Sequence, residues 1–124
     1  MQRLVRGDAF RLDIPALAEG GRHADLVWLC EPNNPTGTAE PPERIGELLN
    51  LLSSAADRDG CPAPAVVVDE AYSEFVGRPV FPLRSQSPRL VVIRTPSRAA
   101  SLPRPRAVCP VARPETPAPP TRPA

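Results

Sequence analysis

The segment Ala65-Val66-Val67-Val68-Asp69-Glu70-Ala71-Tyr72-Ser73-Glu74-Phe75 is the most informative about the fold. It opens with four apolar residues, three of them β-branched, and then turns abruptly polar. Leu26–Leu29 and Leu90–Ile93 are apolar runs of the same kind and length. Runs without polar alternation are typical of strands buried on both faces, as in a mostly parallel sheet.

A helix is predicted between the first two runs, over roughly Pro41–Arg58. Its apolar residues recur at helical spacing and form one stripe, which comprises Ile45, Leu48, Leu49, Leu52, Ala55 and Ala56. Pro41 and Pro42 suit the first turn, and Gly60 can end the helix. The unit is therefore strand, crossover helix, strand, and the fold class is α/β with a mostly parallel sheet.

The flanking segments give shorter predictions. Phe10–Leu12 is expected to form a short strand, and Ile14–Glu19 one or two helical turns. Three prolines between Tyr72 and Leu90 predict an irregular connection. From Pro96 onward, 9 of the last 29 residues are proline, against 10 in the first 95. We therefore expect residues 107–124 to be a disordered Pro/Ala/Arg-rich tail, Pro110–Ala124 above all.

Composition excludes several classes of partner. The 124 residues carry a net charge of +1, with acids and bases mixed along the chain, so neither nucleic acid nor a membrane surface is an expected partner. No apolar run approaches the roughly 20 residues of a membrane-spanning helix, and we expect a cytoplasmic protein. Cys30, Cys61 and Cys109 lack ligand-type spacing, and the single His23 cannot complete a metal set with them, so free thiols and no metal are expected.

Polar residues follow each apolar run at the point where ligands bind in open α/β sheets. Leu29 leads to Asn33-Asn34-Pro35-Thr36-Gly37, and Val68 leads to Asp69. Taken alone, the first motif is ordinary turn chemistry and the second an ordinary strand end. Their order and spacing, with Tyr72 three residues after Asp69, favour a shared site.

The two blocks at residues 31–38 and 66–75 resemble fold-type-I pyridoxal-phosphate-dependent aminotransferases of class I and II, nearest to the histidinol-phosphate aminotransferase branch. The resemblance covers about Phe10–Arg106. It implies a part of the large domain in residues 1–106, a partial three-layer α/β sandwich, a pyridoxal phosphate cofactor, a small-molecule substrate and homodimeric relatives. It leaves the oligomeric state of this chain and its amino-acid substrate open.

The resemblance assigns roles to three residues. Asn34 and Tyr72 match the family's hydrogen-bonding partners of the cofactor's phenolic oxygen. Asp69 matches the carboxylate beneath the pyridine nitrogen, where a negative charge keeps that nitrogen protonated. Glu70 is then a neighbour of the site, as a solvated or an ion-paired charge.

A third block follows Ile93. The resemblance aligns Thr95, Ser97 and Arg106 with groups that hold the cofactor phosphate, although all three could equally be ordinary loop residues. Arg98 falls at the position of the Schiff-base lysine, and the chain's fifteen basic residues are all arginine. A guanidinium stays protonated and has no free amine to attack an aldehyde, so it cannot replace that lysine.

The sequence therefore predicts a truncated aminotransferase that is inactive as written. A gene remnant, a reading-frame error near Thr95 and a split protein all fit this prediction. The alternative is a non-enzymatic binding or interaction module. In either case, a sheet with one uncovered face is expected to be marginally stable and prone to associate.

Overall fold

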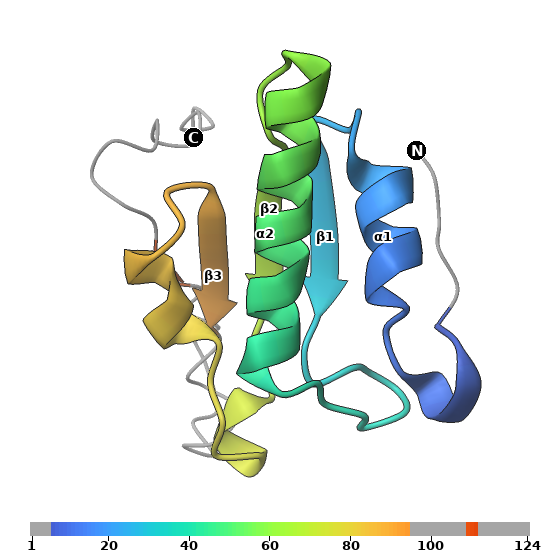
Figure 1. Cartoon of the computed structure of the whole chain (residues 1–124). Helices are drawn as coiled ribbons and strands as arrows, with labels where there is room; N and C mark the ends of the chain where they lie inside the picture. Colours follow the sequence, from blue (N-terminus) through green and yellow to red (C-terminus); the bar gives the residue numbers. More distant parts are fainter. Residues whose placement is uncertain (1–5, 95–108, 112–124) are drawn as a thin grey trace, which may run out of the picture.

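The computed structural model describes residues 6–94 and 109–111 (Figure 1). Its helices and strands in chain order are α1 (Ile14–Gly21), β1 (Leu26–Cys30), α2 (Pro42–Asp59), β2 (Ala65–Asp69), β3 (Leu90–Arg94) and β4 (Cys109–Val111). Short 3-10 turns occupy Asp8–Phe10, Ser73–Phe75 and Phe81–Ser85. None of the helices in these ranges is long and apolar enough to cross a membrane.

The strands form one sheet in the order β1-β2-β3-β4. The first three are parallel, as their apolar sequences predict, whereas β4 pairs antiparallel with β3. The prediction of a structureless tail from residue 107 is therefore wrong for Cys109–Val111. This short segment can still join the sheet because Val92, Ile93 and Arg94 offer it a free edge. The rest of the predicted tail lies outside the described residues.

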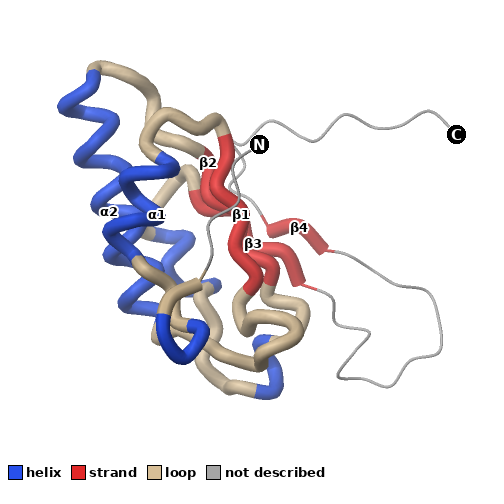
Figure 2. The backbone as a smooth tube through the Cα atoms, turned by 90° about the vertical axis from the view of Figure 1, so that its right-hand side faces the viewer, coloured by secondary structure: helices blue, strands red, loops and turns tan. Residues whose placement is uncertain are grey.

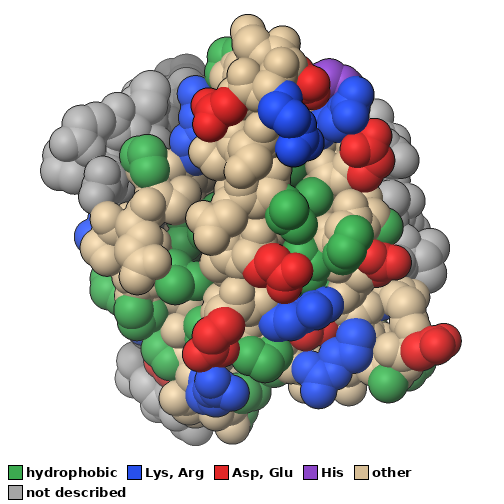
Figure 3. All heavy atoms as spheres, in the orientation of Figure 1, with side chains coloured by type: hydrophobic (Ala, Val, Ile, Leu, Met, Phe, Trp, Pro, Cys, Tyr) green, Lys and Arg blue, Asp and Glu red, His purple; other side chains and the backbone are tan. Residues whose placement is uncertain are grey.

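Both α-helices lie on the same face of the sheet (Figure 2). The described residues thus supply two layers, a sheet and one helical cover, of the partial three-layer sandwich expected from the sequence. Arginine and acidic side chains are interspersed over the outer surface of the helical layer, which agrees with the mixed charge of the sequence (Figure 3).

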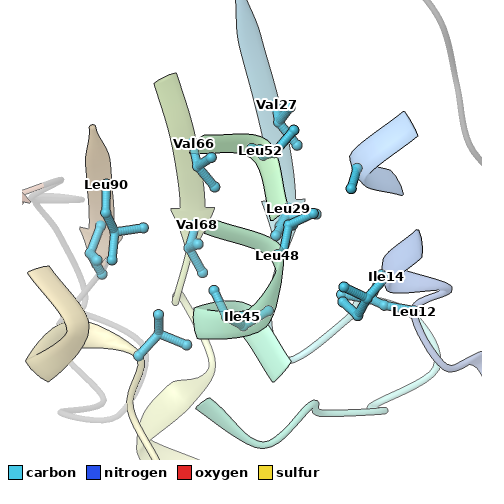
Figure 4. Packing of buried hydrophobic residues seen from close by; sticks show 13 residues of the cluster. Leu12, Ile14, Val27, Leu29, Ile45, Leu48, Leu52, Val66, Val68 and Leu90 are labelled. Atoms are coloured by element: carbon cyan, nitrogen blue, oxygen red, sulfur yellow. The ribbon is translucent and has the colours of Figure 1, made fainter. Parts of the chain in front are cut away.

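Helix α2 forms where its apolar stripe predicts it. Pro42 stands in the first turn, and Gly60 ends the helix with a left-handed backbone (φ 63°, ψ 29°) that glycine adopts without a steric penalty. The stripe packs on alternate residues of the strands (Figure 4). The buried apolar core consists of Leu12, Ile14, Ala18, Val27, Leu29, Ile45, Leu48, Leu52, Val66, Val68, Val80, Leu90 and Val92.

The opposite face of β1 is open. Leu26 and Trp28 are 49% and 56% exposed, whereas Val27 and Leu29 between them are buried. The prediction that all three apolar runs are buried on both faces is therefore wrong for β1. It holds better for the central strand, where Val66, Val67 and Val68 are all buried, because strands flank β2 on both sides.

The N-terminal segment differs from its prediction in one respect. Phe10 lies in a 3-10 turn with positive φ, and no strand forms at Phe10–Leu12. Helix α1 is found, extended to Gly21, and Asp13 caps it by accepting a hydrogen bond from the Ala16 N–H at 3.0 Å. Local capping thus decides where the helix begins.

The two leucines Leu48 and Leu51 test the packing of α2. Leu48 is fully buried and Leu51 is 39% exposed on the same helix. We predict that Leu48→Ala lowers the free energy of unfolding by about 2–5 kcal/mol, because it leaves a cavity against the sheet, and that Leu51→Ala costs less than about 1 kcal/mol. Urea unfolding followed by circular dichroism measures both. Equal losses would contradict the observed packing of α2.

Candidate functional site

The carboxyl ends of the three parallel strands meet at one edge of the sheet, the lower edge in Figure 1. There Cys30 lies opposite Asp69, and Asp69 lies opposite Ile93. Two hydrogen bonds continue the ladder past the strands: the Glu31 N–H donates to the Asp69 carbonyl at 3.0 Å, and the Glu70 N–H donates to the Ile93 carbonyl at 2.8 Å. The segments that follow each strand therefore start side by side.

The Asn-Asn-Pro-Thr-Gly motif forms a tight loop after β1. Backbone hydrogen bonds of 2.8 Å join Asn33 to Thr38 and to Gly37, and the Asn33 side-chain amide donates to the Thr36 hydroxyl at 2.7 Å. Gly37 supplies the positive φ of 70° that the turn requires. The hydrogen bonds of Asn33 thus stabilise the loop, whereas the Asn34 side chain is exposed.

Asp69 and Tyr72 lie on the connection that leaves β2. The Asp69 carboxylate accepts a hydrogen bond from the Ala71 N–H at 3.1 Å. Its side chain alternates with the buried Val68 and Glu70 and is half-buried on the face opposite the helices. The half-buried Tyr72 begins the next turn, and its ring lies 6.4 Å from that of Phe75.

Glu70 is an ion-paired residue of the interior. It is 2% exposed, accepts a hydrogen bond from the Val80 N–H, and binds Arg94 Nε at 2.9 Å. The Arg94 guanidinium also lies over the Phe81 ring, 5.2 Å from its centroid. Of the two possibilities for Glu70, the ion pair is the observed one, and it fastens the connection after β2 to the end of β3.

Two more buried glutamates hold the loop after β1. Glu31 pairs with Arg6 at 2.5 Å and accepts a hydrogen bond from the Glu40 N–H at 3.0 Å. Glu40 in turn accepts from the Leu12 N–H at 2.7 Å. Burial raises the pKa of Glu31 above its ordinary value of 4.5, even though its hydrogen bonds from Glu40 and Arg6 act in the opposite direction.

The supporting glutamates were missed from the sequence. Glu31 and Glu40 each directly precede a proline in the loop after β1, where acidic residues are ordinarily exposed. Their partners Arg6 and Leu12 lie 25 and 28 positions away in the chain, so no local spacing reveals them. The only signal was the position of Glu31 directly after a strand. The three glutamates Glu31, Glu40 and Glu70 line a cavity of about 10 Å³, room for roughly one water molecule and no larger ligand.

The structure therefore brings Asn34, Asp69 and Tyr72 to one edge of the sheet, on the loops after β1 and β2. Their amide, carboxylate and phenol groups are the chemical set that the pyridine nitrogen and phenolic oxygen of pyridoxal phosphate would require. The other predicted site positions, Thr95, Ser97, Arg98 and Arg106, lie outside the described residues. Their roles stay predictions.

The sequence profile of aminotransferase class I and II matches residues 3–112. The chain belongs to this family. The parallel sheet with its crossover helix and the polar strand ends are thus features of an aminotransferase fold.

Curated relatives name one branch of the family. The chain is 43% identical over 96 residues to a histidinol-phosphate aminotransferase of Xylella fastidiosa, covering 75% of this chain and 24% of the relative. It is 41% identical over 90 residues to the same enzyme of Thermococcus gammatolerans, covering 73% and 23%. The chain therefore spans about a quarter of the length of the relatives it matches.

Solved structures agree with this fold. An amino transferase from Eubacterium rectale superposes with a TM-score of 0.70 at 31% identity, over 90% of this chain and 29% of that one. A histidinol-phosphate aminotransferase from Clostridium acetobutylicum gives a TM-score of 0.58 at 24% identity, over 72% and 25%. The first likeness extends over nearly the whole of this chain.

Glu70 and Glu74 provide a matched pair of carboxylates on the connection after β2. Glu70→Ala removes the acceptor of the buried Val80 N–H and the partner of Arg94, so we predict a loss of about 2–3 kcal/mol in the free energy of unfolding. Glu74 is exposed, and Glu74→Ala should change stability by no more than about 0.5 kcal/mol. Chemical denaturation of both variants tests this difference. A Glu70→Ala protein as stable as Glu74→Ala would show that the contacts of Glu70 with Val80 and Arg94 do not stabilise the fold.

The raised pKa of Glu31 predicts a pH effect. The folded state holds this proton more tightly than the unfolded chain, so the contribution of Glu31 to stability is greatest below pH 4.5 and falls as the pH rises through the raised pKa. Glu31→Gln abolishes this titration. We therefore expect the stability of Glu31→Gln relative to the unaltered chain to increase from pH 4 to pH 7 in denaturant titrations. If the stability of Glu31→Gln relative to the unaltered chain falls from pH 4 to pH 7, the pKa of Glu31 is lowered and not raised.

Proposed function

We propose that this chain supplies the pyridine-facing side of a pyridoxal phosphate site in an aminotransferase of the histidinol-phosphate kind. The parallel register that sets Cys30 opposite Asp69 supports this proposal most strongly. It brings the loop bearing Asn34 next to Asp69 at the end of β2, from which the connection bearing Tyr72 departs. The similarity to histidinol-phosphate aminotransferases supports the same branch.

Each residue has a definite task in this proposal. One carboxylate oxygen of Asp69 accepts a hydrogen bond from the Ala71 N–H. The other carboxylate oxygen would keep the pyridine nitrogen protonated. Asn34 and Tyr72 hydrogen-bond the phenolic oxygen. The cofactor, when bound, supplies an electron sink for cleavage of the substrate's Cα–H bond. Thr95, Ser97 and Arg106 are proposed to hold its phosphate.

We further propose that the 124-residue polypeptide does not transfer amino groups by itself. Residues 1–106 would form part of a large domain, and Arg98 would stand at the lysine position. In the family, a lysine amine both bonds to the cofactor and moves the substrate's α-proton. This chain contains no lysine, and its fifteen lysine-or-arginine residues are all arginine. The permanently charged guanidinium performs neither task.

A non-enzymatic binding module is the second candidate, and the open face of β1 favours it. Leu26 and Trp28 present exposed apolar surface there, which is characteristic of surfaces that contact another protein segment. A sharp cooperative melt of a monomeric chain that has no affinity for pyridoxal phosphate would favour this candidate over the first.

Asp69→Asn tests the cofactor site directly. Because the substitution replaces a charge-assisted hydrogen bond with a neutral one, we predict about tenfold weaker binding of pyridoxal phosphate. The matched control is Asp57→Asn on the exposed surface of α2, which should leave the dissociation constant unchanged. Fluorescence titration with pyridoxal phosphate measures all three proteins, and circular dichroism confirms that each is folded. Equal affinities for Asp69→Asn and the unaltered chain would refute the assignment.

The absence of lysine from the sequence predicts that pyridoxal phosphate forms no covalent bond to a side chain of the same samples. Borohydride reduction after incubation with pyridoxal phosphate should leave no cofactor attached to any internal side chain, as peptide mass mapping would show. A label on the α-amino group of Met1 does not bear on the prediction. No transamination of glutamate or histidinol phosphate is expected. A borohydride-reducible adduct on an internal residue would overturn the proposal that no side chain of this polypeptide can bond covalently to pyridoxal phosphate.

A further inference from the structure

A second cluster of ligand-type side chains lies at the end of the sheet opposite the cofactor edge. His23, Asp59 and Cys61 place an imidazole nitrogen, a carboxylate oxygen and a thiol sulfur within 4.8 Å of one another. We propose that these three residues bind a divalent transition metal, with Zn²⁺ as the preferred ion. This site shares no residue with the proposed cofactor site.

The fold builds the cluster from the ends of both helices. His23 follows directly after Arg22, the C-cap of α1, and Asp59 is the last residue of α2. The left-handed Gly60 then reverses the chain, and the Cys61 N–H donates to the Ala56 carbonyl at 3.1 Å. The reversal sets Cys61 beside Asp59. Figure 3 shows the chain's only histidine at this end of the molecule, among arginine and acidic side chains.

The position of α1 is fixed by close packing. A Cβ added at Gly21 would lie 2.9 Å from a Val27 methyl group and 3.5 Å from Leu52. The end of α1 therefore approaches β1 and α2 as closely as a glycine allows. His23, two residues later, is held near the end of α2 by this contact.

The ligand types select the metal. One nitrogen, one oxygen and one sulfur suit Zn²⁺, which binds three protein ligands tetrahedrally and leaves a fourth position for water. Magnesium and calcium prefer sites made of oxygen alone. Zinc bonds of about 2.0–2.3 Å set tetrahedral ligands roughly 3.3–3.8 Å apart, so the cluster must contract by about 1 Å. The His23 side chain, 64% exposed, is free to make this movement.

Arg22 competes with the metal. Its Nε donates to His23 Nε2 at 2.9 Å and lies 3.6 Å from an Asp59 carboxylate oxygen. The positively charged guanidinium thus contacts two of the three metal-ligating groups, the His23 imidazole and the Asp59 carboxylate. A metal ion must displace it, and Glu19, 3.3 Å from Arg22 Nη1, offers the displaced side chain another partner. Removal of Arg22 is therefore expected to strengthen metal binding.

Cysteine and histidine spacing in the sequence predicts no metal set. That expectation missed the cluster because it left out carboxylate ligands and because His23 and Cys61 are 38 positions apart, on separate elements. Only the packing of α1 beside α2 brings the three side chains together.

Zinc titration of the reduced 124-residue chain, in competition with a chromophoric chelator, tests the site. We expect one Zn²⁺ per chain, with affinity lowered at least about tenfold by His23→Ala or Cys61→Ser and raised several-fold by Arg22→Gln. Cys30→Ser, which removes the other described free thiol, is the matched control and should bind as the unaltered chain does. Circular dichroism checks that each variant remains folded.

Cobalt substitution gives a second readout. A Co²⁺ complex should show a thiolate-to-metal charge-transfer band that is lost in Cys61→Ser and kept in Cys30→Ser. Absence of stoichiometric zinc binding, or binding that survives both His23→Ala and Cys61→Ser, would overturn the proposal. Weaker binding in Arg22→Gln would contradict the role of the guanidinium as a competitor. Asp69→Asn should leave zinc affinity unchanged, which separates this test from that of the cofactor site.

Discussion

The parallel register between β1 and β2 positions the loops at the carboxyl edge of the sheet. Cys30 lies opposite Asp69, and the Glu31 N–H closes the ladder on the Asp69 carbonyl. Side chains alternate across a strand, so a slip of β2 by one residue would turn both Asp69 and Val67 toward α2. The burial of Val66 and Val68 under the helix opposes that slip. Hydrophobic packing on one face thus decides where a carboxylate stands on the other.

Buried carboxylates secure the loops at this edge. Glu31, Glu40 and Glu70 each accept a hydrogen bond from a backbone N–H and each pair with an arginine. Burial of a charge is costly, and removal of one partner leaves the other uncompensated. These pairs are therefore better understood as determinants of loop position than as sources of net stability. They connect segments that the sheet alone leaves independent: the N-terminal turn, the loop after β1 and the end of β3.

Much of this arrangement could be predicted from the sequence because it depends on local pattern. The apolar runs, the stripe of α2 and the stop at Gly60 gave the parallel α/β unit with boundaries within one residue for the helix. Predictions failed where partners are distant in the chain. Trp28 is exposed because nothing in residues 6–94 or 109–111 covers it. Cys109–Val111 pairs with a strand edge that ends 15 residues earlier, and the arginine that pairs with Glu31 comes from the N-terminal segment. Apolar character cannot say which neighbours a strand will have.

Nuclear magnetic resonance on the isotope-labelled chain measures the strand register directly. Cross-strand nuclear Overhauser effects should place Cys30 beside Asp69 and Asp69 beside Ile93, all with parallel connectivity. The Glu31 and Glu70 amides should exchange as slowly as those within the strands, because both donate to strand carbonyls. An antiparallel pattern, or a shift of one residue that pairs Cys30 with Glu70, would contradict the placement of Asp69 and with it the proposed cofactor site.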